Sequence, residues 1–337
     1  MGSSSGKRIV VATHGHCFDG IASAAVFTTL RRRLGGGSGG RNALAFHYRS
    51  CGYGPNLQTV PERWLRGDEN AILDFRFTDS RRLTWYFDHH PTAFANPHQR
   101  DRALAGADRY FFDDGYGSCT KLIADVAAEK YGIALDHHEE LIAWADRIDA
   151  ARFESAADAI DRTLPVAQLA AVVEHGGNGD LYNALIPELV DKPLADVTAL
   201  ESVRAAWRPL AEAQADTRRR IEAALERRGN VAFADLHRAP LRSSGKFVAY
   251  ALAPDCAYSV ALIRMARHLK ISIGFNPWSG QTRHHDIAAL CRRHGGGGHP
   301  VVGAIPVPLD RIERAQHLCR DVIAHLNEPG AGPSSGG

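Results

Sequence analysis

The sequence predicts a two-part α/β protein, with a mostly parallel β-sheet in the N-terminal part and a second, smaller α/β unit near the C-terminus. Strand-like and helix-like segments alternate over the first half of the chain, which is typical of a parallel sheet with helical connections. A charged helical stretch follows, and strand-like segments then return. The length agrees with this division, because 337 residues suggest about two domains.

The N-terminal elements are short apolar runs separated by helical segments. Arg8–Ala12 is a β-branched run, and Gly20–Arg33 has helical composition. The other expected strands are Ala43–Tyr48, Ala71–Phe75 and Thr84–Phe87, and the other expected helices are Cys119–Lys130 and His137–Ile148. The glycine run Gly35–Gly40 is expected to form a mobile loop. In parallel sheets with buried strands, functional residues gather at the carboxyl ends of the strands.

The second half begins with a helical region, of which Ala205–Arg228 is expected to be one long, solvent-exposed helix. The strands expected after it are Asn230–Asp235, Phe247–Leu252 and Lys270–Phe275. The helices expected there are Tyr258–His268, His285–His294 and Leu309–Leu326. The expected organisation is a disordered tail over residues 1–7, a first domain over 8–195, a helical linker over 196–228, a second domain over 229–327 and a disordered tail over 328–337.

Composition excludes several classes of protein. The chain has 40 Lys+Arg against 38 Asp+Glu, and this net charge of +2 argues against a protein that coats nucleic acid by bulk electrostatics. The six cysteines form no C-x-x-C pair, so neither a zinc ribbon nor a disulfide framework is indicated. Without a secretory signal or an apolar stretch of membrane-spanning length, we expect a cytoplasmic protein with no membrane partner.

Histidine and aspartate follow the expected strands and end one of the expected helices. T-H-G-H-C-F-D-G occupies Thr13–Gly20, Asp74 closes A-I-L-D, Asp88-His89-His90 follow W-Y-F, and Asp146 and Asp149 lie in W-A-D-R-I-D. Mixed nitrogen and oxygen ligands suit Mn²⁺, Zn²⁺ or Fe²⁺, and the set is large enough for two ions that share a carboxylate. Two ions about 3.5–4 Å apart form the usual clamp for phosphoester hydrolysis.

A second motif, H-G-G-G-G-H-P at His294–Pro300, follows the helix candidate that ends in Arg292 and Arg293. Glycines leave backbone N–H groups open to the close approach of an anion, and His299 and the arginines add positive charge. The motif therefore predicts a site for a phosphate or a nucleotide.

Together these motifs resemble the DHH/DHHA1 phosphoesterase family. The ordered set consists of Asp74, F-D-H-H at Phe87–His90, Asp146 and G-G-G-G-H-P at Gly295–Pro300. The resemblance implies a DHH-like metal-binding catalytic domain followed by a DHHA1-like substrate-binding domain. It also implies a phosphodiesterase with two divalent metal ions, typically Mn²⁺, with Fe²⁺ or Zn²⁺ as alternatives. The family includes RecJ-like exonucleases and nanoRNases.

Carried over by position, the resemblance implies a role for each site residue. His90 would face the scissile phosphate, Asp88 would orient the neighbouring histidines, and Asp74 would bridge the metals. The implied metal ligands are His14, His16, Asp19, Asp74, His89 and Asp146. The implied substrate-binding residues are Gly296, Gly297, Gly298, His299 and Asn276. Spacing does not decide between Asp146 and Asp149, and the family pattern favours Asp146.

The first motif departs from the family pattern at Cys17, where the family usually has an aspartate two residues before Asp19. A first metal site rebuilt from His14 and His16, with Cys17 as a further ligand, would be softer and richer in nitrogen. Such a site would favour Fe²⁺ or Zn²⁺ over Mn²⁺. The alternative is that one metal site is lost.

Two further motifs have structural interpretations. The second D-H-H, at Asp136–His138, is expected to start a helix, because Asp136 and Glu139 have the spacing of a capping box. Ser118 and Cys119 are expected to cap and pack the helix that follows them.

The expected function is hydrolysis of phosphodiester bonds in short oligonucleotides or small nucleotides by a hydroxide that two metals activate. The near-neutral charge argues against processive work on long DNA. The alternatives are a phosphomonoesterase or pyrophosphatase acting on small phosphates, and a degenerate, non-catalytic module that binds nucleotides or nucleic acid. A homodimer also stays open.

Overall fold

The computed structural model describes residues 6–35, 44–52, 59–105, 107–176 and 179–329. The chain divides into two compact units: unit 1 runs up to Arg152 and includes Arg162–Arg208, and unit 2 comprises Phe153–Asp161 and the chain from Pro209 onward. The division falls inside helix α9 (Glu201–Ala224), at a proline in the helix interior. Most of the two predicted tails and of the predicted loop at 35–40 lies outside the described residues.

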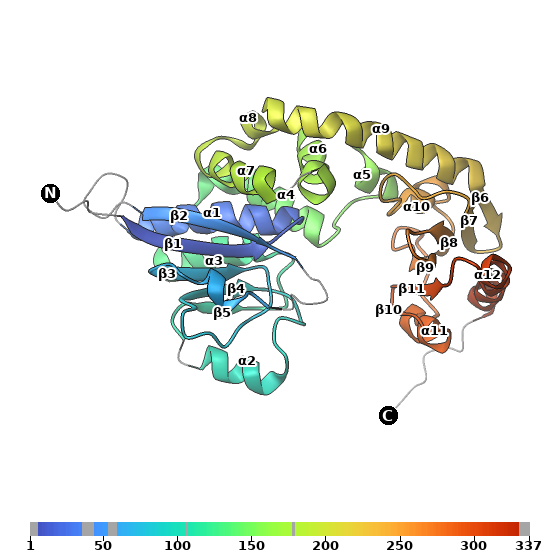
Figure 1. Cartoon of the computed structure of the whole chain (residues 1–337), viewed down its shortest axis with the longest axis horizontal. Coiled ribbons are helices and arrows are strands. Elements are labelled where there is room, and N and C mark those ends of the chain that lie inside the picture. The colour runs from blue at the N-terminus through green and yellow to red at the C-terminus, as the bar shows by residue number, and fades with distance from the viewer. Residues whose placement is uncertain (1–5, 36–43, 53–58, 106, 177–178, 330–337) are drawn as a thin grey trace. The chain divides into compact units, whose positions relative to one another are not determined.

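Unit 1 contains a parallel sheet of five strands in the order β2-β1-β3-β4-β5 (Figure 1). The strands are β1 (Lys7–His14), β2 (Leu44–Cys51), β3 (Glu69–Leu73), β4 (Trp85–Asp88) and β5 (Tyr110–Phe112). The predicted parallel sheet is confirmed, although the sequence analysis missed the three-residue β5. Because β1 lies between β2 and β3, the chain reverses direction across the sheet there, and α/β proteins bind ligands at such a switch point.

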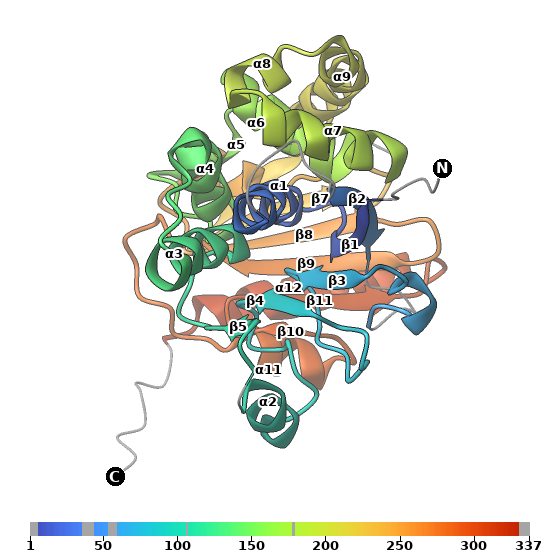
Figure 2. The same ribbon diagram turned by 90° about the vertical axis from the view of Figure 1, so that its left-hand side faces the viewer.

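Helices cover the sheet of unit 1 on one face, and loops with one helix cover the other. The α-helices are α1 (Phe18–Leu34), α2 (Pro97–Leu104), α3 (Cys119–Tyr131), α4 (Glu139–Asp149), α6 (Pro165–Ala171), α7 (Gly179–Asp191) and α8 (Leu194–Thr198), and the other helical turns are η1 (Glu62–Trp64), η2 (Asp136–His138) and η3 (Val172–Gly176). Helix α1 packs against α3, α4, α7 and β1 (Figure 2). Ala12, Ile72 and Tyr86 are paired across three strands and pack in the apolar cluster on one face of the sheet.

Glu69, at the start of β3, is a buried carboxylate with a full set of donors. The Arg31 guanidinium donates to its two oxygens at 2.6 and 2.7 Å, the Trp85 indole N–H donates at 3.0 Å, and Lys7 Nζ lies at 2.6 Å. Burial alone would raise the pKa of Glu69, but these donors outweigh it and lower the pKa to about 2.

Replacing Glu69 with glutamine is expected to lower the free energy of unfolding by about 3 kcal/mol at pH 7, because the largely buried Arg31 loses its charge partner. The pKa of Glu69 is lower in the folded protein than the usual value of about 4.3, so its stabilisation is complete above that pH and is lost as the pH falls toward 2. Urea unfolding at pH 7 and near pH 2 tests this. A stability difference between the two proteins that did not shrink in acid would contradict it.

Unit 2 contains a mixed sheet of six strands in the order β10-β11-β9-β8-β7-β6, in which only β7 and β8 are parallel. The strands are β6 (Leu225–Arg228), β7 (Val231–Leu236), β8 (Tyr258–Arg264), β9 (Leu269–Phe275), β10 (Gly297–His299) and β11 (Val302–Val307), and the helices besides α9 are α5 (Ala156–Ile160), α10 (Val248–Leu252), α11 (Ile287–Arg293) and α12 (Ile312–Asn327). Apolar residues of the sheet, α11 and α12 form its core.

Two predicted elements of unit 2 are wrong in type. The segment Phe247–Leu252 was expected as a strand but forms α10, and Tyr258–His268 was expected as a helix but contains β8. In β8 the buried residues Tyr258, Val260 and Leu262 alternate with more exposed ones, the period of a strand with one buried face. Pairing with β7 and β9 on both sides holds this segment extended, a tertiary contact that local composition does not reveal.

The expected long helix over Ala205–Arg228 has the predicted length of 24 residues but begins and ends four residues earlier. Helix α9 ends at Ala224, and Leu225–Arg228 form β6, which pairs antiparallel with β7. Among the described residues, no helix is both long enough and apolar enough to cross a membrane.

Candidate metal centre

The register of the parallel strands brings three predicted site residues to one edge of the sheet in unit 1. The residues paired on the last shared rung of β1, β3 and β4 are Thr13, Leu73 and Phe87. His14, Asp74 and Asp88 each follow one of these residues, so all three lie at the carboxyl ends of adjacent strands. This edge includes the switch point between β1 and β3, where the fold leaves room for a ligand.

Asp74 lies at the middle of this group. Its side chain is fully buried, and neither carboxylate oxygen has a hydrogen-bond partner in the part of the chain that the structure describes. Imidazole nitrogens of His14, His89 and His90 lie 3.4, 3.7 and 3.5 Å from it. Its backbone has a left-handed φ of 54°, which is uncommon for aspartate. A buried carboxylate without hydrogen bonds is costly, and a bound cation would satisfy it.

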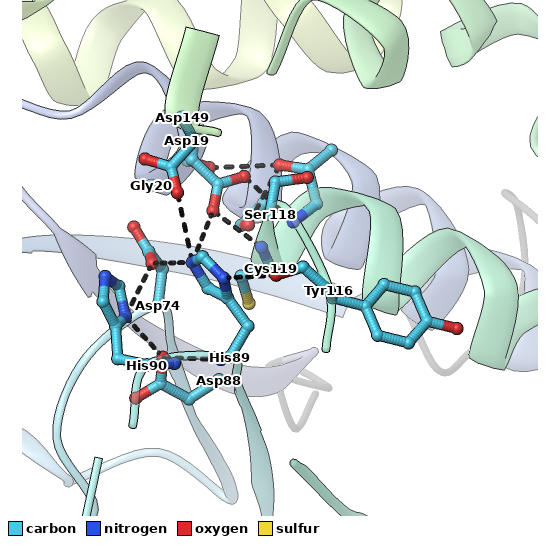
Figure 3. A network of polar contacts seen from close by, with 12 residues as sticks. Asp19, Gly20, Asp74, Asp88, His89, His90, Tyr116, Ser118, Cys119 and Asp149 are labelled. Carbon is cyan, nitrogen blue, oxygen red and sulfur yellow. Dashed lines mark hydrogen bonds and ion pairs between the residues drawn. The ribbon is translucent and has the colours of Figure 1, made fainter. Parts of the chain in front are cut away.

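His89 faces three carboxylates. Its Nδ1 donates to the Tyr116 carbonyl at 3.1 Å, which turns Nε2 toward the carboxylates (Figure 3). Nε2 lies 3.2 Å from Asp149, 3.7 Å from Asp74 and 3.8 Å from Asp19. A backbone carbonyl on the far nitrogen is the usual arrangement for a metal-binding histidine, because it sets the tautomer and orients the ring.

Asp19 is positioned by the N-terminus of α3. Its two oxygens accept the backbone N–H groups of Cys119 at 2.7 Å and Thr120 at 3.0 Å. Ser118 caps the same helix by accepting the N–H of Lys121, and Cys119 is buried, so the predicted capping and packing roles are confirmed. The contacts join α1 to α3 and hold the Asp19 carboxylate beside His89.

Asp88 orients His90. One oxygen of Asp88 accepts Nδ1–H of His90 at 2.8 Å and the backbone N–H groups of His89 and His90 at 2.8 and 3.2 Å, and the other accepts the Tyr86 hydroxyl at 3.0 Å. The carboxylate is buried, whereas the His90 side chain is 33% exposed. The bond to Nδ1 therefore leaves Nε2 of His90 as the ring nitrogen available to a substrate.

The side chains form three overlapping groups of metal-ligand type. The groups are His14 with Cys17 and Asp74, Asp74 with His89 and His90, and Asp19 with His89 and Asp149, each with ligand atoms within 4.8 Å of one another. Asp74 and His89 each belong to two groups, as expected for a centre in which neighbouring ions share ligands. The donor set and the unsatisfied Asp74 fit divalent cations.

The pKa values reflect a buried, acidic centre. Burial and the neighbouring carboxylates Asp19, Asp88 and Asp149 raise the pKa of Asp74 well above its usual value. Burial and Asp149 likewise raise the pKa of Asp19 to about 6. Burial would lower the pKa of His89, but Asp149 and Asp19 raise it to about 9. Carboxylates so close together repel one another, and positive charge relieves that repulsion.

The first group of ligands, at the end of β1, differs in charge from the rest of the centre. Burial and the neighbouring His90 lower the pKa of His14, so its neutral, metal-binding form is favoured. Burial and the carboxylates of Asp74 and Asp149 raise the pKa of the Cys17 thiol well above its usual value.

Two residues predicted as metal ligands lie outside these groups. Asp146 forms an ion pair with Arg152 and accepts the Ser118 hydroxyl at 3.4 Å, and it is Asp149, one turn later at the end of α4, that reaches His89. His16 is exposed and has a left-handed φ of 56°, while Cys17 joins His14 and Asp74. The structure thus places Asp149, rather than Asp146, beside His89, and it groups Cys17 with His14 and Asp74.

Asn276, predicted to bind substrate, has a structural position in unit 2. Its side chain is fully buried, and its amide donates to the carbonyls of Pro254 and Cys256 at 3.0 and 3.1 Å and accepts the Trp278 N–H at 3.1 Å. The Asn276 amide N–H groups and its carbonyl oxygen all take part in these bonds, which hold the turn after β9.

The glycine motif forms the edge strand β10, paired with β11. A Cβ atom at Gly296 would lie 2.1 Å from the Ala304 carbonyl oxygen, and one at Gly298 would lie 2.2 Å from the Val302 carbonyl oxygen. Close backbone packing therefore explains these two glycines without a ligand. Gly297, where a Cβ would meet nothing within 4 Å, and the exposed His299 are open to a ligand, and their substrate-binding role remains a prediction.

The second D-H-H starts a helix, as predicted, but without the capping box. Asp136–His138 form η2 ahead of α4, and neither helix has a side-chain cap. His138 is buried and forms a hydrogen bond with the Thr29 hydroxyl at 2.8 Å, so this motif packs α4 against α1.

No protein-family model matches the chain, and no curated protein matches its sequence. Solved structures match its fold. The pGpG-specific phosphodiesterase PggH from Vibrio cholerae has a TM-score of 0.68 at 15% identity, over 95% of this chain and 99% of that one. A DHH domain described as belonging to a family of ribosomal proteins has a TM-score of 0.57 at 12% identity, over 96% of this chain and 88% of that one. The chain has a DHH-type fold.

Exonuclease RecJ bound to manganese has the same fold, with a TM-score of 0.51 at 14% identity, over 95% of this chain and 90% of that one. The resemblance drawn from Phe87–His90 is thus confirmed for the fold. At these identities the likeness does not extend to the substrate. Within the DHH-type fold, the arrangement of Asp74, His89 and Asp149 is what indicates a chemical function.

Proposed function

We propose that the chain is a metal-dependent phosphoesterase that hydrolyses phosphodiester bonds in short oligonucleotides or small nucleotides. The observation that carries the proposal is the buried Asp74 carboxylate, which has no hydrogen-bond partner among the described residues and belongs to two groups of metal-ligand type. Two proteins with the same fold support the substrate class, since one is a pGpG-specific phosphodiesterase and the other an exonuclease.

The proposed centre holds two divalent cations, which would activate a water molecule and neutralise the phosphoryl charge. The side chains proposed to hold them are His14, Cys17, Asp19, Asp74, His89 and Asp149. Mn²⁺ is the ion expected from the family resemblance, with Fe²⁺ and Zn²⁺ as alternatives.

His90 is the proposed contact to the reacting phosphate. Asp88 holds Nδ1–H of His90, so in the imidazolium form Nε2 presents a second N–H to a phosphoryl oxygen. A donor fixed in this way stabilises negative charge that develops in the transition state. Asp88 is a positioning residue, because the His90 ring depends on it for orientation.

The proposal keeps a substrate-binding role for the glycine motif of unit 2. Gly297 and His299 lie on the exposed edge strand β10, where a phosphate or a nucleotide could accept hydrogen bonds. Gly296 and Gly298 contribute by allowing the hairpin backbone to approach closely. Asn276 is no longer part of the proposed substrate site.

An assay with three substrate types tests the function. The protein is loaded with Mn²⁺, Zn²⁺ or both and given pGpG and other 5′-labelled dinucleotides, phosphoadenosine phosphate, and pyrophosphate. We expect metal-dependent release of mononucleotides from the dinucleotides, which a chelator abolishes. Hydrolysis of the phosphomonoester or pyrophosphate alone would favour the alternative phosphatase.

The matched control for this assay is the second D-H-H motif. Asp88→Asn is expected to lower kcat by roughly 100-fold, because His90 loses the partner that orients it. Asp136→Asn changes the same residue type in the same tripeptide on η2 and should leave kcat unchanged. No turnover on any substrate by a metal-loaded protein would overturn the proposed function.

A further inference from the structure

We infer that the two proposed metal sites are chemically different, and that Cys17 makes the first of them select a thiophilic ion while the second accepts Mn²⁺. The inference rests on the proposed function, since it concerns the same metal centre. The first site consists of His14, Cys17 and Asp74, and the second of Asp19, His89 and Asp149.

The donors of the two groups differ in kind. The first offers one imidazole, one sulfur and one carboxylate, whereas the second offers one imidazole and two carboxylates. Thiolate ligands select ions such as Zn²⁺ and Fe²⁺, and carboxylate-rich sites suit Mn²⁺ and Mg²⁺. Cys17 is the only cysteine among the described residues that belongs to such a group. The other five are buried, and Cys119, which lies beside Asp19, directs its sulfur to the Phe87 carbonyl at 3.3 Å.

The buried carboxylate of Asp74 independently indicates a ligand at the first site. Its Oδ2 lies 3.4 Å from Nδ1 of His14, and neither of its oxygens has a hydrogen-bond partner among the described residues, although its side chain is fully buried. A cation between His14, Cys17 and Asp74 would satisfy this oxygen. The sulfur therefore lies beside a carboxylate that already needs a positive partner.

The loop that carries Cys17 is held in place from several sides. The Tyr182 hydroxyl donates to the His14 carbonyl at 2.6 Å, and the Thr13 hydroxyl donates to the Gly20 carbonyl at 2.6 Å. A Cβ atom at Gly20 would lie 2.1 Å from the His14 carbonyl oxygen, so the loop and α1 approach as closely as the backbone allows. Cys17 is the N-cap residue of α1, so these contacts hold its backbone in place, and its sulfur lies within 4.8 Å of the ligand atoms of His14 and Asp74.

Cobalt binding tests the inference without an activity measurement. Metal-free protein is titrated with Co²⁺, and the near-ultraviolet thiolate-to-cobalt charge-transfer band is recorded. We expect one Co²⁺ per chain to produce the band and Zn²⁺ to displace it. Cys17→Ser and Cys17→Asp should abolish the band, while Cys51→Ala, which removes a buried cysteine on β2 of the same unit, should retain it.

Metal content then tests the selectivity. After dialysis against equal Zn²⁺ and Mn²⁺, we expect one Zn²⁺ and one Mn²⁺ per chain in the parent, and a Zn²⁺-over-Mn²⁺ preference at least about 100-fold weaker in Cys17→Asp. Bound metal without the band, or a band that survives in Cys17→Ser, would overturn the inference and leave the phosphoesterase proposal standing. A protein that binds no metal would overturn both.

Discussion

Replacing Asp74 with asparagine should lower phosphodiester hydrolysis by at least about 1,000-fold and remove most of the bound metal. Asp74 is a ligand of the first proposed ion site and lies 3.7 Å from Nε2 of His89, a ligand of the second, so its loss removes a ligand from one site and a neighbouring negative charge from the other. Metal ions contribute several kcal/mol of transition-state stabilisation, and each 1.36 kcal/mol corresponds to a tenfold change in rate. Metal content by elemental mass spectrometry and kcat on a dinucleotide measure the two effects.

The control for this substitution is the unfolding temperature, which shows whether the variant still folds. Asparagine has nearly the shape of aspartate and carries no charge, so the metal-free variant should unfold at a temperature no lower than that of the metal-free parent. Added metal should raise the unfolding temperature of the parent and not that of the variant, because only the parent binds it tightly. Unchanged metal content and unchanged turnover in Asp74→Asn would mean that the centre does not depend on this carboxylate.

Asp149→Asn and Asp146→Asn should differ sharply, although the two residues lie three apart on the same helix. Asp149 lies 3.2 Å from Nε2 of His89, whereas Asp146 pairs with Arg152. We expect Asp149→Asn to weaken metal binding by at least about 100-fold and turnover in proportion. Asp146→Asn should leave metal affinity within about twofold of the parent, since an exposed ion pair contributes little.

Isothermal titration of the metal-free proteins separates the two carboxylates. The two variants carry the same substitution of the same residue type on the same helix. A difference in their metal affinity therefore reflects only the positions of the two residues on α4. Equal affinities for the two variants, or a larger loss in Asp146→Asn, would restore the assignment that the family pattern favoured.

Much of the fold followed from local patterns. The strands of unit 1 are short apolar runs whose ends carry polar residues. The predicted strand Arg8–Ala12 lies within β1, and Ala71–Phe75 overlaps β3 but extends two residues past its end. In unit 2 the segment Tyr258–His268 was mistaken for a helix. Its extended form depends on β7 and β9, whose residues come from either side in the sequence.

The candidate site was predictable in part. Asp74, Asp88, His89 and His90 follow strands directly, and strand direction alone places such residues at one edge of a parallel sheet. The contacts of Asn276 were not predictable in this way, because they depend on carbonyls about 20 residues away, just before β8, that the pairing of β8 with β9 brings to it.

By itself the sequence determined the α/β class, the strand ends that carry the ligands and the unusual cysteine at position 17, because each of these depends on residues close together along the chain. Only the tertiary structure brought Asp149, rather than Asp146, beside His89 and grouped Cys17 with His14 and Asp74. Residues a few positions apart on a helix or in a loop point their side chains in different directions. The packing of α1, α3 and α4 determines which of these side chains faces the metal centre. The local sequence around each residue does not determine this packing.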